Sequence, residues 1–268
     1  MTEPYVALIT GASSGIGEAT ARRVAREPDV RLVLVARREE RLRALADELG
    51  GASTIALDLT EPDAPARVRE LVQREHGRLD LLVNNAGAAW RGSFGDTGSE
   101  NVQRHMKLNF EAPVRLTEQL LPLLRATAAR GGGRQVAIVN VASTAARVSR
   151  PRSGAYSASK AALAGWTDAL LGEERRHGVH VGMVLPGFVK TEGFPAAELV
   201  GKANTRWLVS SPERVADAVW EAGPGGKAER YAPRFYWLAA AARVLAPAVV
   251  RRATAGGGLA TATKADRD

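Results

Sequence analysis

Short apolar runs alternate with longer amphipathic runs along most of the chain. The short runs are rich in Val, Leu and Ile and show little polar alternation, which is typical of parallel strands covered on both faces. Their alternation with helical patterns predicts repeated β–α–β units. The predicted strands are Tyr5–Thr10, Arg31–Ala36, Thr54–Asp58, Leu79–Asn84, Val136–Ala142 and His180–Leu185, with a weaker seventh at Lys227–Ala232.

The longer runs repeat their apolar residues with the period of an α-helix. They predict helices over Ile16–Arg26, Glu39–Leu49, Ala64–His76, Glu100–Thr127, Ala155–His177 and Pro212–Glu221. Pro113 lies inside the fourth helix and predicts a kink or break, and Pro122 marks its last turns. The order of elements predicts an α/β fold of the Rossmann type, a doubly wound parallel sheet of about seven strands with helices on both faces.

One domain of this kind accounts for residues 1–232, and nothing predicts a second. Residues 187–210 form an irregular segment after the sixth strand. Residues 233–268 depart from the β–α alternation and predict an apolar helical extension that Pro247 interrupts, followed by a flexible tail rich in Gly, Ala and Thr.

The composition excludes several kinds of chemistry. The 268 residues contain no cysteine, so disulfides, thiolate metal sites and thiol catalysis are ruled out. The four histidines form no metal-binding pair, and no metal site is predicted. The chain opens directly on a strand without a secretory signal, and no run reaches the about eighteen apolar residues of a spanning helix, so we expect a cytoplasmic protein.

The net charge of +8 has two interpretations. It can reflect an arginine-rich composition, or it can indicate binding to nucleic acid or to an anionic membrane surface. The arginines are spread over many segments and form no platform with aromatic residues. This spread favours the first interpretation and argues against a nucleic-acid partner.

A glycine-rich turn follows the first predicted strand. The segment TGASSGIG, residues 10–17, ends at the start of the first helix and carries Gly11, Gly15 and Gly17. Glycine lets a backbone turn tightly and approach a pyrophosphate closely, and the N–H groups that open the next helix point at phosphate oxygens. The position of this turn predicts a dinucleotide site.

The second strand indicates which dinucleotide is bound. A site for NAD commonly ends this strand with an acidic residue that binds the adenosine ribose, but here Ala36 stands at that position and Arg37 follows. A guanidinium pairs well with a 2′-phosphate. NADP(H) is therefore the preferred cofactor, with NAD(H) as the alternative. Arg37 and Arg38 can also simply begin a solvated helix.

These motifs, with others in the same order along the chain, resemble the short-chain dehydrogenase/reductase family. The resemblance extends to about residue 192. It is carried by TGASSGIG at 10–17, Asp58 after the third strand, NNAG at 84–87, Asn109 in KLNF, Ser143 in NVAS, YSASK at 156–160 and PGFVKT at 186–191.

The resemblance implies a set of site residues. The implied catalytic residues are Asn109, Ser143, Tyr156 and Lys160. The implied cofactor-binding residues are Gly11, Ser13, Ser14, Gly15, Ile16, Gly17, Arg37, Arg38, Asp58, Leu59, Asn85, Ala86, Gly87, Tyr156, Lys160, Pro186, Gly187, Val189 and Thr191. Among these, Asp58 is expected at the adenine ring. Asp58 can also cap the loop that follows it, and Asn109 can be an exposed polar residue of a long helix.

The implied chemistry is the interconversion of a carbonyl and an alcohol. The cofactor carries the hydride, and Tyr156 gives or accepts the proton. Lys160 lies one helical turn further on the same face, where its cation is expected to lower the tyrosine pKa. Ser143 is expected to hydrogen-bond the substrate oxygen, and Asn109 to hold a water that links Lys160 to solvent.

The substrate side is less determined. The segment 187–210 carries Phe188, Phe194, Trp207 and Leu208, and the resemblance makes it a lid over an apolar pocket. The arginines of the loop before Tyr156 can bind an acidic group or face solvent; they are Arg147, Arg150 and Arg152. The stretch 233–252 can rest on a membrane or pack over the cleft or a second subunit, and packing is favoured.

The sequence therefore predicts an NADP(H)-dependent oxidoreductase acting on a small carbonyl or alcohol of apolar character. The predicted assembly is a homodimer or homotetramer through the helices Glu100–Thr127 and Ala155–His177. Two alternatives stay open. One is a catalytically silent NADP-binding sensor or scaffold, and the other is a membrane-associated reductase of a lipid-like substrate.

Overall fold

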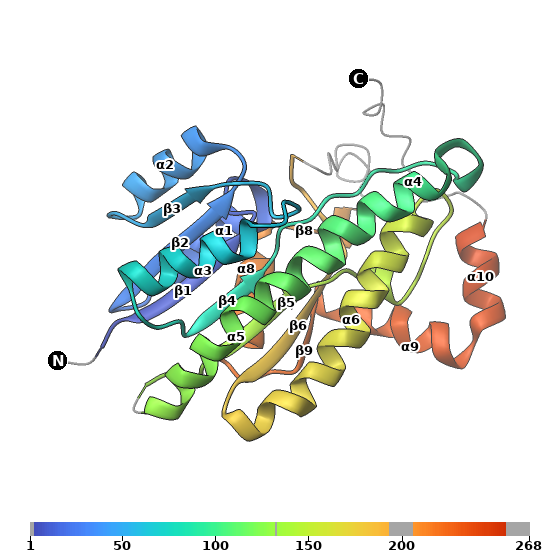
Figure 1. The fold of residues 1–268 in the computed structure, drawn as a ribbon. Coiled ribbons are helices and arrows are strands. Elements are labelled where there is room, and N and C mark those ends of the chain that lie inside the picture. The colour runs from blue at the N-terminus through green and yellow to red at the C-terminus, as the bar shows by residue number, and fades with distance from the viewer. Residues whose placement is uncertain (1–2, 132, 193–205, 256–268) are drawn as a thin grey trace.

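A seven-stranded parallel sheet forms the centre of the protein, with the strand order β3-β2-β1-β4-β5-β6-β9 (Figure 1). The computed structural model describes residues 3–131, 133–192 and 206–255. The strands are β1 (Tyr5–Thr10), β2 (Val30–Ala36), β3 (Ser53–Ala56), β4 (Leu81–Asn84), β5 (Ala137–Val141), β6 (His180–Pro186) and β9 (Glu229–Ala232). The predicted strands are confirmed, including the weak seventh one.

Helices cover both faces of this sheet. Side chains of β1 alternate between the two faces, so that Ile9 packs with one helical layer and Leu8 with the other, both fully buried. The first layer contains α1 (Gly15–Val24), α2 (Glu39–Glu48) and α8 (Pro212–Ala222). The second contains α3 (Ala64–Glu75), α5 (Ala112–Arg130) and α6 (Gly154–Glu174). The predicted doubly wound α/β fold is confirmed.

The predicted helix Glu100–Thr127 consists of three segments. They are α4 (Phe94–Met106), a π-helical turn over Lys107–Glu111, and α5. The chain does not leave the helical conformation here, and the irregularity predicted from Pro113 takes the form of the π-helical turn immediately before it, next to a residue that has no N–H to donate. Pro122 lies inside α5, about two turns before its end at Arg130, which agrees with the prediction that it marks the last turns, and α5 packs Leu120 and Leu124 into the core.

The order of strands reverses between β1 and β4. The chain builds β1, β2 and β3 outward in one direction, and then α3 returns it to β4 on the other side of β1. Loops at the carboxyl ends of β1 and β4 therefore leave the sheet in opposite directions. Such a reversal opens a crevice where ligands bind in sheets of this class.

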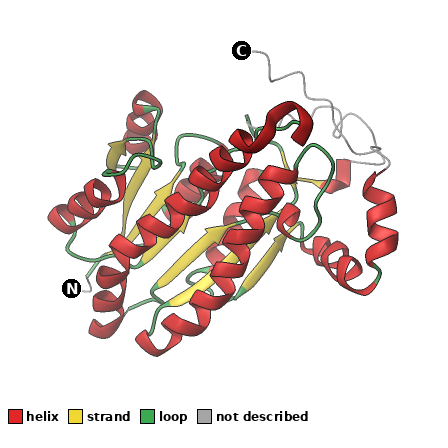
Figure 2. Cartoon of the chain, turned by 45° about the vertical axis from the view of Figure 1, so that its right-hand side comes forward, coloured by secondary structure: helices red, strands yellow, loops and turns green. Residues whose placement is uncertain are grey.

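A small appendage follows the sheet at the β9 edge. It contains α9 (Trp237–Leu245) and α10 (Pro247–Ala255), which lie beyond the sheet on the side of α6 (Figures 1 and 2). Pro247 begins α10, so the predicted interruption of the extension separates two helices. A short parallel pair, β7 (Phe188–Val189) with β8 (Val209–Ser210), lies between β6 and α8 in the chain.

Part of the predicted lid, including Phe194, and the predicted tail from residue 256 onward lie outside the described residues. Across the residues that are described, none of the helices has the length and apolar character needed to cross a membrane.

Candidate active site

The glycine turn has a shape that only glycine can adopt without strain. Gly11 and Gly15 have φ angles of 67° and 57°, in the left-handed region. A Cβ on Gly17 would lie 2.3 Å from the carbonyl oxygen of Gly11, so a side chain there would force the turn apart. Ser14 precedes α1 without capping it through its side chain, which leaves the first N–H groups of the helix available. The turn fits a phosphate group.

The turn after β4 braces the glycine turn. The Thr10 hydroxyl accepts hydrogen bonds from the backbone N–H groups of Asn85 and Ala86, at 2.9 and 3.0 Å. The Asn85 side-chain amide donates to the carbonyl of Thr10 at 2.8 Å. The predicted segment NNAG therefore holds the ends of β1 and β4 together at the reversal in strand order.

Arginines and one acidic residue gather where β2 ends. Arg37 is exposed, and Arg38 donates to the hydroxyl and the carbonyl of Ser13, each at 3.2 Å. Arg38 also pairs with Glu192 at 2.9 Å, and the same carboxylate accepts from Arg41 at 2.6 Å. Glu192 and Arg41 were not predicted as part of this region. No sequence signal indicates the contact, because the partners lie more than 150 residues apart.

Asp58 caps the loop that follows β3. Its carboxylate accepts from the Thr60 backbone N–H at 2.9 Å and from the Thr60 hydroxyl at 2.8 Å. Burial opposes its charge, but these two donors hold the pKa of Asp58 below its ordinary value. The capping interpretation is therefore correct. The side chain also lines the cavity described below, so the predicted role toward a ligand stays compatible with it.

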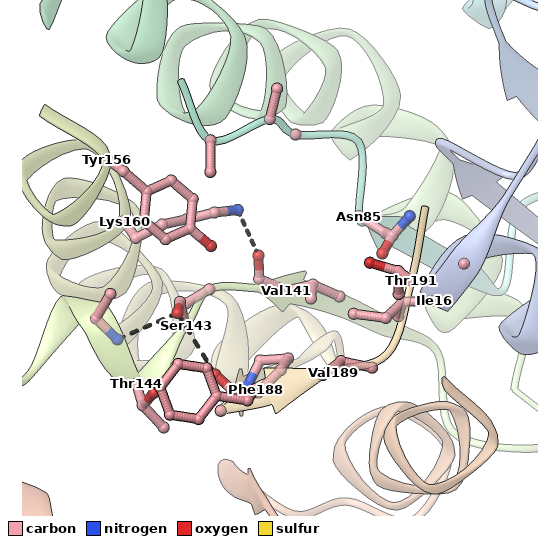
Figure 3. Close-up of a pocket in the computed structure, with 18 of the residues that line it drawn as sticks. Ile16, Asn85, Val141, Ser143, Thr144, Tyr156, Lys160, Phe188, Val189 and Thr191 are labelled. Carbon is pink, nitrogen blue, oxygen red and sulfur yellow. Dashed lines mark hydrogen bonds between the residues drawn. The ribbon is translucent and has the colours of Figure 1, made fainter. Parts of the chain in front are cut away.

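Three of the four residues predicted to be catalytic meet at the end of β5 (Figure 3). Ser143 follows β5, and its hydroxyl accepts from the N–H of Ala145 at 3.1 Å. Tyr156 and Lys160 lie one turn apart on α6, and the tyrosine hydroxyl points into the cavity near Ser143. The Lys160 ammonium donates to the carbonyl of Val141 at 2.7 Å.

Burial controls the protonation of this group. It raises the pKa of the Tyr156 phenol above its ordinary value, and the hydrogen bond with Ser143 offsets only part of this rise. Burial also lowers the pKa of Lys160 to about 8. Loss of solvent therefore dominates the pKa of Tyr156 in the protein alone, and the lowering by Lys160, which was expected with a cofactor holding the lysine, stays a prediction. At neutral pH the phenol is a protonated donor.

Asn109 lies just behind this group. It is fully buried in the π-helical turn, so the exposed-residue interpretation is wrong. Its side-chain oxygen accepts from the Ala88 N–H at 3.0 Å, and its amide donates to the Ala88 carbonyl at 2.9 Å and to Ser159 at 3.1 Å. A Cβ on Gly87 would lie 2.9 Å from the Asn109 oxygen and 3.4 Å from the Lys160 ammonium.

One cavity of about 620 Å³ joins these features. Every predicted site residue lines it except Gly17, whose role is to permit the turn, and Asn109, which lies behind the wall. Its volume lies within the range of about 300–1,000 Å³ that is typical of small-molecule and cofactor sites. The geometry therefore offers a phosphate cradle at one end and a buried proton donor at the other.

The far wall of the cavity comes mostly from residues outside the family motifs, with Phe188 of PGFVKT as the exception. Phe188 is buried against it, and Arg91 and Arg150 contribute two guanidinium groups. The appendage closes this side with Tyr236, Ala239, Ala240, Val250, Ala253 and Thr254. The interpretation that the extension packs over the cleft is therefore correct. A signal for it existed in the apolar character of the stretch, but its docking surface could not be read from sequence.

Comparison with known proteins gives a consistent assignment. A profile of the short chain dehydrogenase family matches residues 5–198. Dehydrogenase/reductase SDR family member 7B of Danio rerio is 34% identical over 196 residues, which cover 69% of this chain and 61% of that protein. The chain thus spans less than two thirds of that relative.

Solved structures extend the likeness over more of the chain. A short-chain dehydrogenase from Streptomyces avermitilis superposes with a TM-score of 0.76 at 30% identity, covering 94% of this chain and 97% of that one. The L-sorbose reductase of Gluconobacter frateurii, solved with NADPH and L-sorbose, gives a TM-score of 0.73 at 31% identity over 85% and 94% of the two chains. The fold, the motifs and these matches together show that the chain belongs to the short-chain dehydrogenase/reductase family.

Proposed function

We propose that the protein interconverts a ketone or aldehyde and the corresponding alcohol with NADP(H), using Tyr156 as the general acid and base. The observation that carries the proposal is the single cavity that contains both the glycine turn and the Ser143, Tyr156 and Lys160 group. A catalytically silent nucleotide-binding scaffold would have no need for a buried tyrosine and a buried lysine that line the cavity, since the polar groups of both are costly to bury.

The described residues fit NADP(H). The glycine turn and the N-terminus of α1 would hold the pyrophosphate, and Asp58 the adenine. Arg37 and Arg38 would bind the 2′-phosphate, and the related sorbose reductase was solved with NADPH. Pro186, Gly187, Val189 and Thr191 would line the nicotinamide end. When bound, NADP(H) supplies or accepts the hydride. NAD(H) is the alternative cofactor.

Tyr156 is suited to donate a proton to the substrate oxygen. Its raised pKa keeps the phenol protonated at neutral pH, which is the form that carbonyl reduction requires. Ser143 would hold the same oxygen and stabilise the negative charge that develops on it. In the opposite direction, the phenol must first lose its proton, so alcohol oxidation is favoured at higher pH.

Lys160 would stabilise the phenolate that forms once the proton has been given away. Its cation lies in a region with little solvent, where a charge acts more strongly than in water. Asn109 is proposed to connect Lys160 to solvent by positioning the backbone of Ala88 and a water near Gly87. The Asn109 oxygen and the Lys160 ammonium both lie close to Gly87, which supports a water at this place that passes protons between Lys160 and solvent.

A second candidate is the same chemistry at a membrane surface. Trp237, Leu238, Val244 and Leu245 are spaced so that they share one face of α9, and they are between 54% and 83% exposed. Arg251 and Arg252 are exposed on the adjoining α10. An apolar stripe beside basic residues is the pattern of an interfacial helix on anionic lipid.

Replacing Tyr156 with Phe tests the proton donor. We expect Tyr156→Phe to lower kcat by at least about a hundredfold, because general acid catalysis is lost while the ring is kept. NADPH affinity, measured by fluorescence titration, should change by less than about threefold. Turnover close to that of the native enzyme would contradict the assignment.

Replacing Arg37 tests the cofactor preference. The native enzyme should bind NADPH at least about tenfold more tightly than NADH, and Arg37→Ala should remove most of this ratio. Arg43→Ala is the matched control, since Arg43 is an exposed arginine of α2 outside the cavity. Equal affinities of the native enzyme for the two cofactors would overturn the preference.

Replacing Lys160 with Met tests its buried charge through stability. The pKa of Lys160 is about 8 in the folded protein and 10.5 in the unfolded chain. Below pH 8 the charged ammonium therefore lowers the stability of the folded protein by its full amount, and this cost declines as the pH rises toward 10.5. Lys160→Met should therefore gain stability over the native protein at pH 7. This gain in the free energy of unfolding should be about 3 kcal/mol larger at pH 7 than at pH 10.5.

Chemical denaturation of the cofactor-free proteins measures this difference, and Lys227→Met, at an exposed lysine, is the control for removing a positive charge. A relative stability of Lys160→Met that does not vary with pH would show that the ammonium is not desolvated. Lys160→Met should also lose most of its turnover.

Vesicle flotation tests the membrane candidate. Native protein should float with vesicles containing phosphatidylserine and less with phosphatidylcholine alone, because the arginines add attraction to anionic lipid. Val244→Glu with Leu245→Glu should abolish flotation without loss of turnover on a soluble substrate. Failure of the native protein to float with either vesicle would eliminate this candidate.

A further inference from the structure

Arg150 is a partly buried cation in the cavity wall that has no acidic partner. Its guanidinium carbon lies 4.6 Å from the centre of the Phe188 ring, and the residue lines the cavity near Tyr156. Throughout residues 3–131, 133–192 and 206–255, no carboxylate lies within ion-pair distance of this side chain. A contact with an aromatic ring takes up none of the acceptor partners that the N–H donors of a guanidinium need.

Comparable arginines elsewhere in the structure are neutralised. Arg147, three residues earlier on the same loop and also at the cavity, pairs with Glu229 at 2.9 Å and with Asp168 at 3.6 Å. Arg78, with only 12% of its side chain exposed, pairs with Asp80 at 2.6 Å. Unlike these two, Arg150 has no carboxylate partner among the described residues. A partly buried positive charge is costly unless a negative charge, here one on a ligand, neutralises it.

The surroundings strengthen the positive field at this point. Arg91 lines the same cavity, and burial together with the Arg91 charge lowers the pKa of Arg150. A hydrogen bond from the Gly92 N–H to the Arg152 carbonyl, 3.1 Å long, joins the two loops that carry these arginines. The loop that carries Arg150 is therefore held against its neighbouring loop in one wall of the cavity.

The remaining wall limits what else the ligand can carry. The wall of the same cavity also includes Val148, Phe188, Tyr236, Ala240 and Val250, which are mostly apolar. A ligand that fits this wall has an apolar body and one charged end. A planar guanidinium with paired in-plane donors matches the two oxygens of a carboxylate.

We propose that Arg150 binds a carboxylate of the substrate, so that the enzyme acts on an oxo acid, or the matching hydroxy acid, with an apolar body. The inference rests on the proposed oxidoreductase function and adds the substrate class. Tyr156 and Ser143 would hold the reacting oxygen, and Arg150 would fix the other end of the molecule. It would thereby determine specificity without taking part in proton transfer.

Steady-state kinetics with matched substrates tests the inference. The substrates are linear oxo acids that differ in the separation of ketone and carboxylate, each paired with its methyl ester. For the best-fitting acid, native enzyme should show a kcat/KM at least about tenfold above that of the ester, and Arg150→Gln should reduce this acid-to-ester ratio by about tenfold to a hundredfold, mainly through KM.

Arg152→Gln is the matched control. Arg152 lies two residues after Arg150, and its side chain is exposed and outside the cavity. Its replacement removes the same charge from the loop, so the acid-to-ester ratio should stay at the native value. Native enzyme that turns over esters as well as acids would overturn the inference and leave the proposed function intact. The same loss in both variants would overturn it as well, because it would reflect only the net charge of the loop.

A binding measurement decides the case even if no oxo acid is turned over. Octanoate and octanamide have the same length and differ in charge, and calorimetry with NADPH-loaded protein can compare them. Native protein should bind octanoate at least about tenfold more tightly, and Arg150→Gln should lose that difference while its NADPH affinity stays native. Equal binding of the two ligands by native protein would refute the carboxylate site.

Discussion

The site depends on the hydrogen bonds that tie Thr10 to the turn after β4. The Thr10 hydroxyl donates to the Val83 carbonyl at 3.1 Å and accepts from the two backbone N–H groups that follow Asn84. The Asn85 amide completes the link from the other side and lies against the glycine turn, where a Cβ on Gly17 would be 2.6 Å from it. Only this bracing lets the two loops diverge at the reversal in strand order and leave a cavity between them.

From that point the cavity runs toward α6 along the backbone of residues 85–88. Asn109 fastens Ala88 through both its N–H and its carbonyl, and Gly87 has no side chain to separate Asn109 from Lys160. The glycine turn and the Tyr156 region are therefore joined by one hydrogen-bonded stretch of backbone. A change at Thr10 or Asn85 should disturb both ends, although neither residue contacts Tyr156 in any described interaction.

Much of this framework could be predicted from sequence, and what could not has a physical cause. Strands such as β1 and β5 are apolar on both faces, so their position follows from composition alone. The protonation of Tyr156 and Lys160 could not be predicted, because the direction of a pKa shift depends on how much solvent reaches the group. The pairing of Glu192 with Arg38 and Arg41 was also beyond sequence reasoning, since it joins distant segments.

The appendage is tied to the same framework and is not an independent addition to it. A Cβ on Gly187 would lie 2.5 Å from the Tyr236 ring, so this glycine of the family motif lets the appendage approach the end of β6 at the cavity. The Tyr236 hydroxyl donates to the Leu208 carbonyl at 3.0 Å, which fixes the ring from the other side. Substitutions in α9 and α10 can therefore reshape the apolar wall opposite Arg150 while Ser143, Tyr156 and Lys160 keep their positions on β5 and α6. The appendage and the loop that carries Arg150 thus line one cavity together with Ser143, Tyr156 and Lys160.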